Sequence, residues 1–99
     1  MEKSKPHYLL KSIQVQMDSP KAMHLTLSAL KGIRASGMSQ TDTWSVVKNL
    51  TAVNFYKSMT TNSDHRAWQD VYHAEWQETV LYIKFQLLGE YVVISFKER

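Results

Sequence analysis

Residues 79–97, TVLYIKFQLLGEYVVISFK, decide the fold of this chain. Two runs of β-branched, aromatic and aliphatic residues lie on either side of Gly89-Glu90, a pattern typical of a β-hairpin. Glycine at the first central position of a two-residue loop favours a type II′ turn. With that turn Leu88 faces Tyr91, and the register of every other pair in the hairpin follows.

This register divides the side chains of the hairpin between two faces. One face pairs only apolar residues and is expected to be buried: Leu87 with Val92, Phe85 with Ile94, and Ile83 with Phe96. The other face pairs Tyr82 with Lys97 and carries Lys84 one pair further along. A slip of one residue would exchange the two faces, so the apolar pattern supports the register.

The residues before the hairpin predict helices followed by one more strand. Apolar spacing indicates helices over about 7–17, 28–36 and 42–50, a short fourth helix from Ala52 to about Ser58, and a β-prone segment at 23–27. Pro6 suits the first turn of the first helix, and Gly37 is expected to end the second. Strands are predicted over about 69–76, 79–88 and 91–97. Helices first and consecutive strands after them predict an α+β fold with an antiparallel sheet.

The length and composition predict one small domain over residues 1–99. Hydrophobic residues make up 43% and charged residues 21% of the chain, close to the globular average, which argues against a disordered chain. The absence of cysteine excludes disulfides and thiolate metal sites. No apolar run reaches the roughly 18 residues of a membrane span, and MEKSKPHYLL lacks the apolar core of a signal peptide. We therefore expect a soluble, cytoplasmic protein.

The charge of the chain favours an anionic partner. The net charge is +3 and the sequence pI is about 9.2, which in a small domain is typical of nucleic-acid binding but also of an ordinary surface. No stretch of the chain is rich in lysine and arginine. If the protein binds phosphate, a few lysine or arginine side chains at specific positions must do so. Tyr82, Lys84 and Lys97 are candidates, and the alternative is a solvated sheet face.

Two other groups of residues carry side chains that are suited to chemistry. The stretch from Phe55 to Thr61, FYKSMTT, is dense in donors and is expected to be a helix end followed by a polar loop that is able to grip a phosphodiester. Asp64, His65, Asp70 and His73 do not have the spacing of known metal ligands. The sequence therefore predicts no metal site and no cofactor.

Several blocks of this chain, in order and at consistent spacing, also occur together in a known family. They are FYKSMTT at 55–61, SDH at 63–65, WQDVY at 68–72, YIK at 82–84 and VISFKE at 93–98. These blocks closely resemble the MqsR family, the motility quorum-sensing regulator toxins of bacterial toxin–antitoxin pairs. The similarity is dense over residues 55–99 and thinner, though co-linear, before them.

The resemblance implies a RelE-like fold, a small antiparallel sheet packed with N-terminal helices. It implies an mRNA interferase, that is, a metal-independent endoribonuclease that cuts mRNA at GCU-type sites and stops translation. It also implies a partner, an MqsA-like antitoxin that binds zinc through one domain and DNA through a helix-turn-helix domain.

The same resemblance assigns roles to individual residues. The catalytic positions of the family fall on Lys57, Gln69, Tyr82 and Lys97. From their places in the donor-rich stretch and on the outer face of the hairpin, and not from the resemblance, Tyr56, Ser58 and Lys84 are expected to contact RNA. Gln69 joins the hairpin residues if positions 69, 71 and 73 share their face while Asp70, Tyr72 and Trp76 turn inward.

Two other classes of function stay open from the sequence. A non-catalytic nucleic-acid-binding regulatory domain would bind in a salt-dependent way without cleavage. A protein-interaction module would neither bind nor cut RNA.

Overall fold

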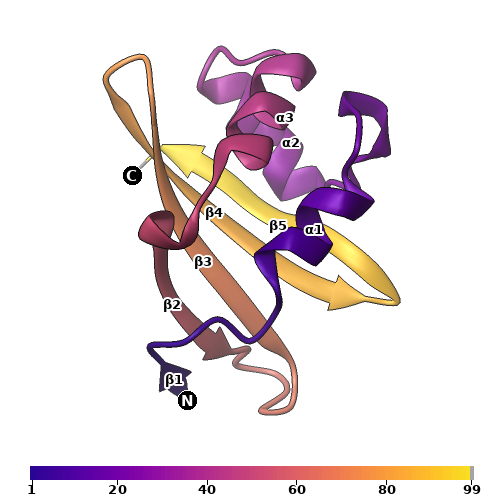
Figure 1. Ribbon diagram of the computed structural model, residues 1–99, viewed down its shortest axis with the longest axis vertical. Helices are drawn as coiled ribbons and strands as arrows, with labels where there is room; N and C mark the ends of the chain where they lie inside the picture. Colours follow the sequence, from indigo (N-terminus) through magenta and orange to yellow (C-terminus); the bar gives the residue numbers. More distant parts are fainter. Residues whose placement is uncertain (99) are drawn as a thin grey trace.

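The computed structural model describes residues 1–98, in which a five-stranded antiparallel sheet packs against three α-helices (Figure 1). The strands follow one another across the sheet in chain order: β1 (Glu2–Lys3), β2 (Phe55–Thr60), β3 (Trp68–Trp76), β4 (Thr79–Leu88) and β5 (Glu90–Glu98). The helices are α1 (Leu10–Gln16), α2 (Leu27–Ala35) and α3 (Gln40–Asn49), with short 3₁₀ turns at Pro20–Ala22 and Ala52–Asn54. The predicted α+β fold is confirmed.

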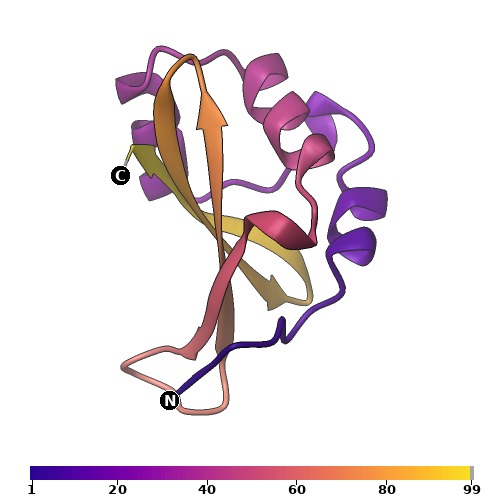
Figure 2. The same ribbon diagram turned by 60° about the vertical axis from the view of Figure 1, so that its left-hand side comes forward.

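The core lies between the helices and the inner face of strands β3 to β5. Its fully buried members from the helical half are Ile13, Met17, Ala29 and Val47, and those from the sheet are Leu81, Ile83, Phe85, Val93 and Phe96. The lower part of the sheet, with β1, the end of β2 and the loop after it, extends beyond the helices (Figures 1 and 2). None of the helices in residues 1–98 is long and apolar enough to cross a membrane.

Helix α2 approaches β5 so closely that only glycine fits at the contact. A Cβ atom built on Gly32 would lie 1.7 Å from the carbonyl oxygen of Phe96. At the end of this helix Gly37 has a φ of 71°, which confirms the predicted stop. The tight packing holds β5 in place beside Lys97.

The predicted hairpin register is confirmed in the half of the hairpin away from the turn. Tyr82 lies opposite Lys97, and Ile83 lies opposite Phe96. Beyond Lys84 a β-bulge shifts the pairing by one residue, so that Phe85 faces Val93.

Because of this shift, the predicted pairs nearer the turn are wrong. Ile94 does not face Phe85, and the turn centres on Gly89, whose φ is 75°, because Leu88 pairs with Glu90. Leu87, expected on the buried face, is 45% exposed because the hairpin tip extends past the core.

The predicted fourth helix is wrong, because most of its residues form β2. Thr51 does cap a 3₁₀ turn, accepting a hydrogen bond from Val53 N at 3.3 Å, but this turn ends at Asn54. From Phe55 the chain is extended and pairs with both β1 and β3. Pairing with segments distant in sequence therefore overrides the local helical pattern.

The first helix begins three residues later than predicted, and Pro6 lies outside it. The backbone N–H groups of His7 and Tyr8 donate to the buried carboxylate of Asp70, at 3.1 and 2.9 Å, which holds this segment on the sheet.

The segment predicted as β-prone at 23–27 forms only an isolated bridge. Leu25 bridges Val93 in parallel, and α2 then begins at Leu27. Its N-cap is Thr26, whose side chain accepts from Ala29 N at 3.1 Å.

Candidate active site

The outer face of the sheet, the face turned away from the core, brings the predicted catalytic lysines into neighbouring rows. One row runs straight across three strand pairs: Lys57 pairs with Val71, Val71 with Lys84, and Lys84 with Ser95. Directly paired residues in a sheet have Cβ atoms about 4.5–5.5 Å apart. Lys57 and Lys84 are therefore separated by a single intervening strand.

The adjacent row carries the predicted tyrosine. His73 pairs with Tyr82, and Tyr82 pairs with Lys97. Tyr82, Lys84 and Lys97, together with Glu98, line an open hollow of about 420 Å³. The expectation that these three side chains gather outside the core is confirmed.

A β-bulge in β2 adds an aromatic side chain to this face. Phe55 pairs with Tyr72 on the inner side, whereas Lys57 pairs with Val71 on the outer side, so the extra residue of the bulge is Tyr56. The bulge therefore places two consecutive residues, Tyr56 and Lys57, on the same face.

Tyr56, His73 and Tyr82 form an aromatic cluster. The ring of Tyr56 stacks on that of His73 with centroids 4.3 Å apart, and meets Tyr82 edge-on at 6.0 Å. The ring centroids of His73 and Tyr82 are 4.7 Å apart. Lys57 Nζ lies 5.4 Å from the centre of the Tyr56 ring. Tyr56 is 51% exposed, so the cluster presents a half-exposed aromatic surface next to the lysines.

Gln69 lies one row further along the outer face, and its side chain is hydrogen-bonded to that of Gln86. Gln69 Nε2 donates to Gln86 Oε1 at 3.0 Å. Asp70 and Tyr72 turn inward and are buried, while Val71 and His73 pair with outer-face residues. The expected alternation along β3 is confirmed, and Trp76 also turns inward and packs against the core.

Lys57 forms an ion pair with Glu2 of the N-terminal strand. The hydrogen bond from Lys57 to this carboxylate raises the pKa of Lys57 above its ordinary value, so its amine is held in the charged form. The Glu2 side chain is 61% exposed, and exposed ion pairs contribute little net free energy. A phosphate group is therefore able to replace the carboxylate.

Lys84 has the opposite shift. Burial lowers the pKa of Lys84, and the positive charges of Lys97 and Lys57 lower it further. A lowered pKa increases the fraction of free amine, which is the form of lysine that accepts a proton. Lys57 and Lys84 therefore differ in the chemistry that they are suited to.

Ser58, expected to contact RNA, lies on the inner face instead. It is fully buried, and its Oγ donates to Asp70 Oδ1 at 2.6 Å. The expectation is corrected: a hydroxyl in this position supports the buried carboxylate and is closed off from RNA. Asp70 and His73 also lie on opposite faces of β3, so they do not share a metal site.

Three residues at this site had no assigned role from the sequence: Glu2, His73 and Gln86. The alternation of β3 and β4 already puts His73 and Gln86 on the outer face, and this period of two was the available signal. The position of Glu2 had no such signal, because its contact with Lys57 spans 55 residues.

The chain is similar to a known protein family and to one of its members. The family described as "Motility quorum-sensing regulator, toxin of MqsA" matches residues 5–98. The mRNA interferase toxin MqsR of Escherichia coli (strain K12) is 34% identical over 99 residues, which cover 100% of both chains.

Proposed function

Since the chain belongs to the motility quorum-sensing regulator toxin family, we propose that the outer face of its sheet is the active site of a metal-independent endoribonuclease. The chain is the toxin of a toxin–antitoxin pair and an mRNA interferase, and its partner is an antitoxin of the MqsA kind. The observation that supports the location of the site is the pairing of Tyr82 with Lys97 beside Lys84.

The reaction requires positive charge around one phosphate. In the proposed step the 2′-oxygen of a ribose attacks the adjacent phosphorus, and the bond from phosphorus to the 5′-oxygen breaks. Negative charge accumulates on the phosphate oxygens in the transition state, so preorganised cations lower the barrier. We assign this role to Lys57 and Lys97, since the raised pKa of Lys57 keeps it charged.

Two protons must move in the same step. One leaves the 2′-hydroxyl, and another reaches the departing 5′-oxygen. We assign the first transfer to Lys84, whose lowered pKa increases the fraction of free amine, and the second to the hydroxyl of Tyr82. The products are a 2′,3′-cyclic phosphate and a 5′-hydroxyl.

The remaining outer-face residues orient the RNA. The ring of Tyr56 is half-exposed and available to stack on a base, as aromatic residues do in single-stranded RNA recognition. Gln69, held by its hydrogen bond with Gln86, is placed to bind the phosphate or a base through its amide.

Two finer points rest on the resemblance of the sequence blocks alone. We propose that cleavage occurs at GCU-type sites in mRNA. We also propose that the antitoxin partner carries a zinc-binding domain and a DNA-binding helix-turn-helix domain.

A cleavage assay in EDTA tests the proposed function. We expect the purified protein to cut a defined RNA in excess EDTA and to leave DNA of the same sequence intact, because DNA lacks the 2′-hydroxyl. End-group analysis should find the cyclic phosphate and the 5′-hydroxyl. If EDTA abolished cleavage and a divalent ion restored it, the roles of Lys57 and Lys97 would be wrong. Salt-dependent binding without cleavage would support the regulatory-domain alternative.

Replacing Lys84 by arginine separates proton transfer from charge. Arginine keeps the positive charge but stays protonated, because its pKa lies above about 12. We expect Lys84→Arg to lower the cleavage rate by about 10²–10⁴-fold, the usual contribution of a positioned acid or base. Binding of a 2′-O-methyl RNA, measured by fluorescence anisotropy, should change little. A variant that cuts at the wild-type rate would show that Lys84 serves only as a cation.

A further inference from the structure

A cleft of about 750 Å³ lies between the loop that joins β2 to β3, the tip of the β4–β5 hairpin, and His7 and Tyr8 of the N-terminal segment. Gln69, one of the predicted catalytic residues, is part of its lining. The side chains in its lining that indicate the chemistry of a ligand are those of Arg66, Gln69, Gln86, Leu87 and Leu88.

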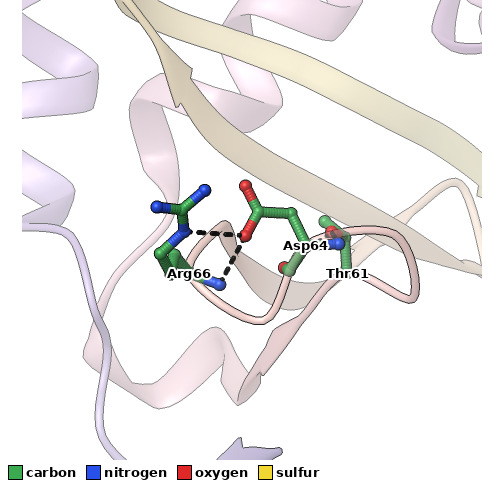
Figure 3. A network of polar contacts seen from close by, with 3 residues as sticks. All are labelled: Thr61, Asp64 and Arg66. Carbon is green, nitrogen blue, oxygen red and sulfur yellow. Dashed lines mark hydrogen bonds and ion pairs between the residues drawn. The ribbon is translucent and has the colours of Figure 1, made fainter.

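The loop wall of the cleft is ordered by its own hydrogen bonds, as Figure 3 shows. Thr61 Oγ1 accepts from Asp64 N at 3.0 Å and donates to Asp64 O at 2.9 Å. Asp64 Oδ1 accepts from Arg66 N at 2.8 Å and from Arg66 Nε at 3.3 Å. The side chain of Arg66 is 93% exposed, so its guanidinium group stands at the cleft and is accessible to solvent.

The hairpin wall of the cleft is apolar. Leu87 and Leu88 are 45% and 55% exposed, although both are large hydrophobic residues next to the core strands. Their side chains offer an apolar surface on which a planar group is able to lie.

The floor of the cleft is the amide pair of Gln69 and Gln86. Their hydrogen bond of 3.0 Å uses one N–H of Gln69 and one lone pair of Gln86 Oε1. Each Gln side chain has two donor N–H groups and an acceptor oxygen. Gln86 therefore keeps its whole NH₂ group, and Gln69 keeps its own oxygen, for a further partner that presents an acceptor next to a donor.

We infer that this cleft binds a nucleobase next to the scissile phosphate and that Gln86 reads its edge. The inference rests on the proposed function and extends it to base selection. Gln86 lies two residues from Lys84 along β4, which is about 7 Å in a strand, so the neighbouring nucleotide of the same RNA reaches it.

The chemistry of the lining matches a nucleobase in three ways. An amide reads the donor and acceptor atoms of a base edge, an apolar surface packs against its ring, and a guanidinium group stacks on it or pairs with its phosphate. A base selected here would confer sequence preference, whereas the lysines act on the backbone that every nucleotide shares.

The variant Gln86→Glu tests this assignment. The carboxylate still accepts the hydrogen bond from Gln69, so the floor of the cleft keeps its structure, but the donor group becomes an acceptor. We expect the preference at one position beside the cut to shift by about tenfold, away from bases that present an acceptor and toward those that present an amino group. Gln86→Met, which removes the polar group, should reduce the preference at that position.

Two measurements read this preference. One is the cleavage of RNA pools randomised around the cut. The other is the binding of short 2′-O-methyl oligoribonucleotides that differ at one base, which lack the attacking hydroxyl. Gln77→Glu is the matched control, because it makes the same change of charge on an exposed residue in the turn between β3 and β4 and should leave the preference unchanged.

The outcomes distinguish this inference from the proposed function. If both Gln86 variants changed all cleavage rates and all affinities by one common factor, the base-reading role would be overturned. If the wild-type protein did not cut RNA but bound oligoribonucleotides with a base preference that Gln86→Glu shifts, the subsite would stand and the nuclease assignment would fall. Without either cleavage or a shifted preference, both would be overturned.

Discussion

Replacing Lys97 by alanine is expected to lower the rate of RNA cleavage by about 10²–10³-fold, as the loss of one preorganised charge-stabilising group does elsewhere. Lys97 pairs with Tyr82 across the hairpin and lines the hollow that also contains Lys84. In the proposed reaction it stabilises charge that is present mainly in the transition state. The loss should therefore appear in the rate of the chemical step more than in the affinity for RNA.

The fold should tolerate this change. Lys97 is exposed, and substitutions of exposed residues usually alter the free energy of unfolding by less than about 0.5 kcal/mol. Single-turnover cleavage and urea denaturation of the same preparation measure the two effects. Lys31→Ala removes an exposed lysine from α2 and is the control that should keep full activity. A folded Lys97→Ala protein with the wild-type rate would place the chemistry elsewhere, with Lys57 the next residue to examine.

Replacing Phe96 by alanine is expected to affect stability, in contrast to Lys97→Ala, which affects the cleavage rate. It should lower the free energy of unfolding by about 3–5 kcal/mol. Phe96 is adjacent to Lys97 in sequence but is fully buried, and it pairs with Ile83 on the inner face. Removing its ring takes away apolar contacts and leaves a cavity in the core beneath α2.

Urea or thermal denaturation measures this loss. Val53→Ala serves as the control, because Val53 is 91% exposed and its truncation should change stability by less than about 0.5 kcal/mol. A Phe96→Ala variant with wild-type stability would contradict the assignment of Phe96 to the core. Together with Lys97→Ala, it tests whether neighbouring residues of β5 have separate roles in stability and in catalysis.

The positions of several site residues were predictable from local pattern. Alternation of apolar and polar residues in β4 and β5 predicted that Tyr82 faces Lys97 on the outer face, and the structure confirms it. The same alternation in β3 predicted that Gln69 lies outward and Asp70 inward. These predictions succeed because a strand turns successive side chains to opposite faces, and burial of one face selects the register.

Other features depended on contacts between distant segments. The stretch from Phe55 to Ser58 was predicted to end a helix and Met59 to Thr61 to form a polar loop, but residues 55–60 form β2 because β1 and β3 supply hydrogen-bonding partners on both sides. Its bulge, which brings Tyr56 beside Lys57, follows from that pairing. Ser58 was expected to contact RNA because it lies in a stretch dense in hydrogen-bond donors, whereas its hydroxyl donates to the buried carboxylate of Asp70.

The sequence by itself determined the α+β class, the extent of β4, and the face on which Tyr82, Lys84 and Lys97 lie, because periodicity in a strand is a property of consecutive residues. Only the tertiary structure decided the ion pair of Lys57 with Glu2 and the lowered pKa of Lys84. Both depend on groups brought close by strand pairing, since burial and charge act through space and not along the chain.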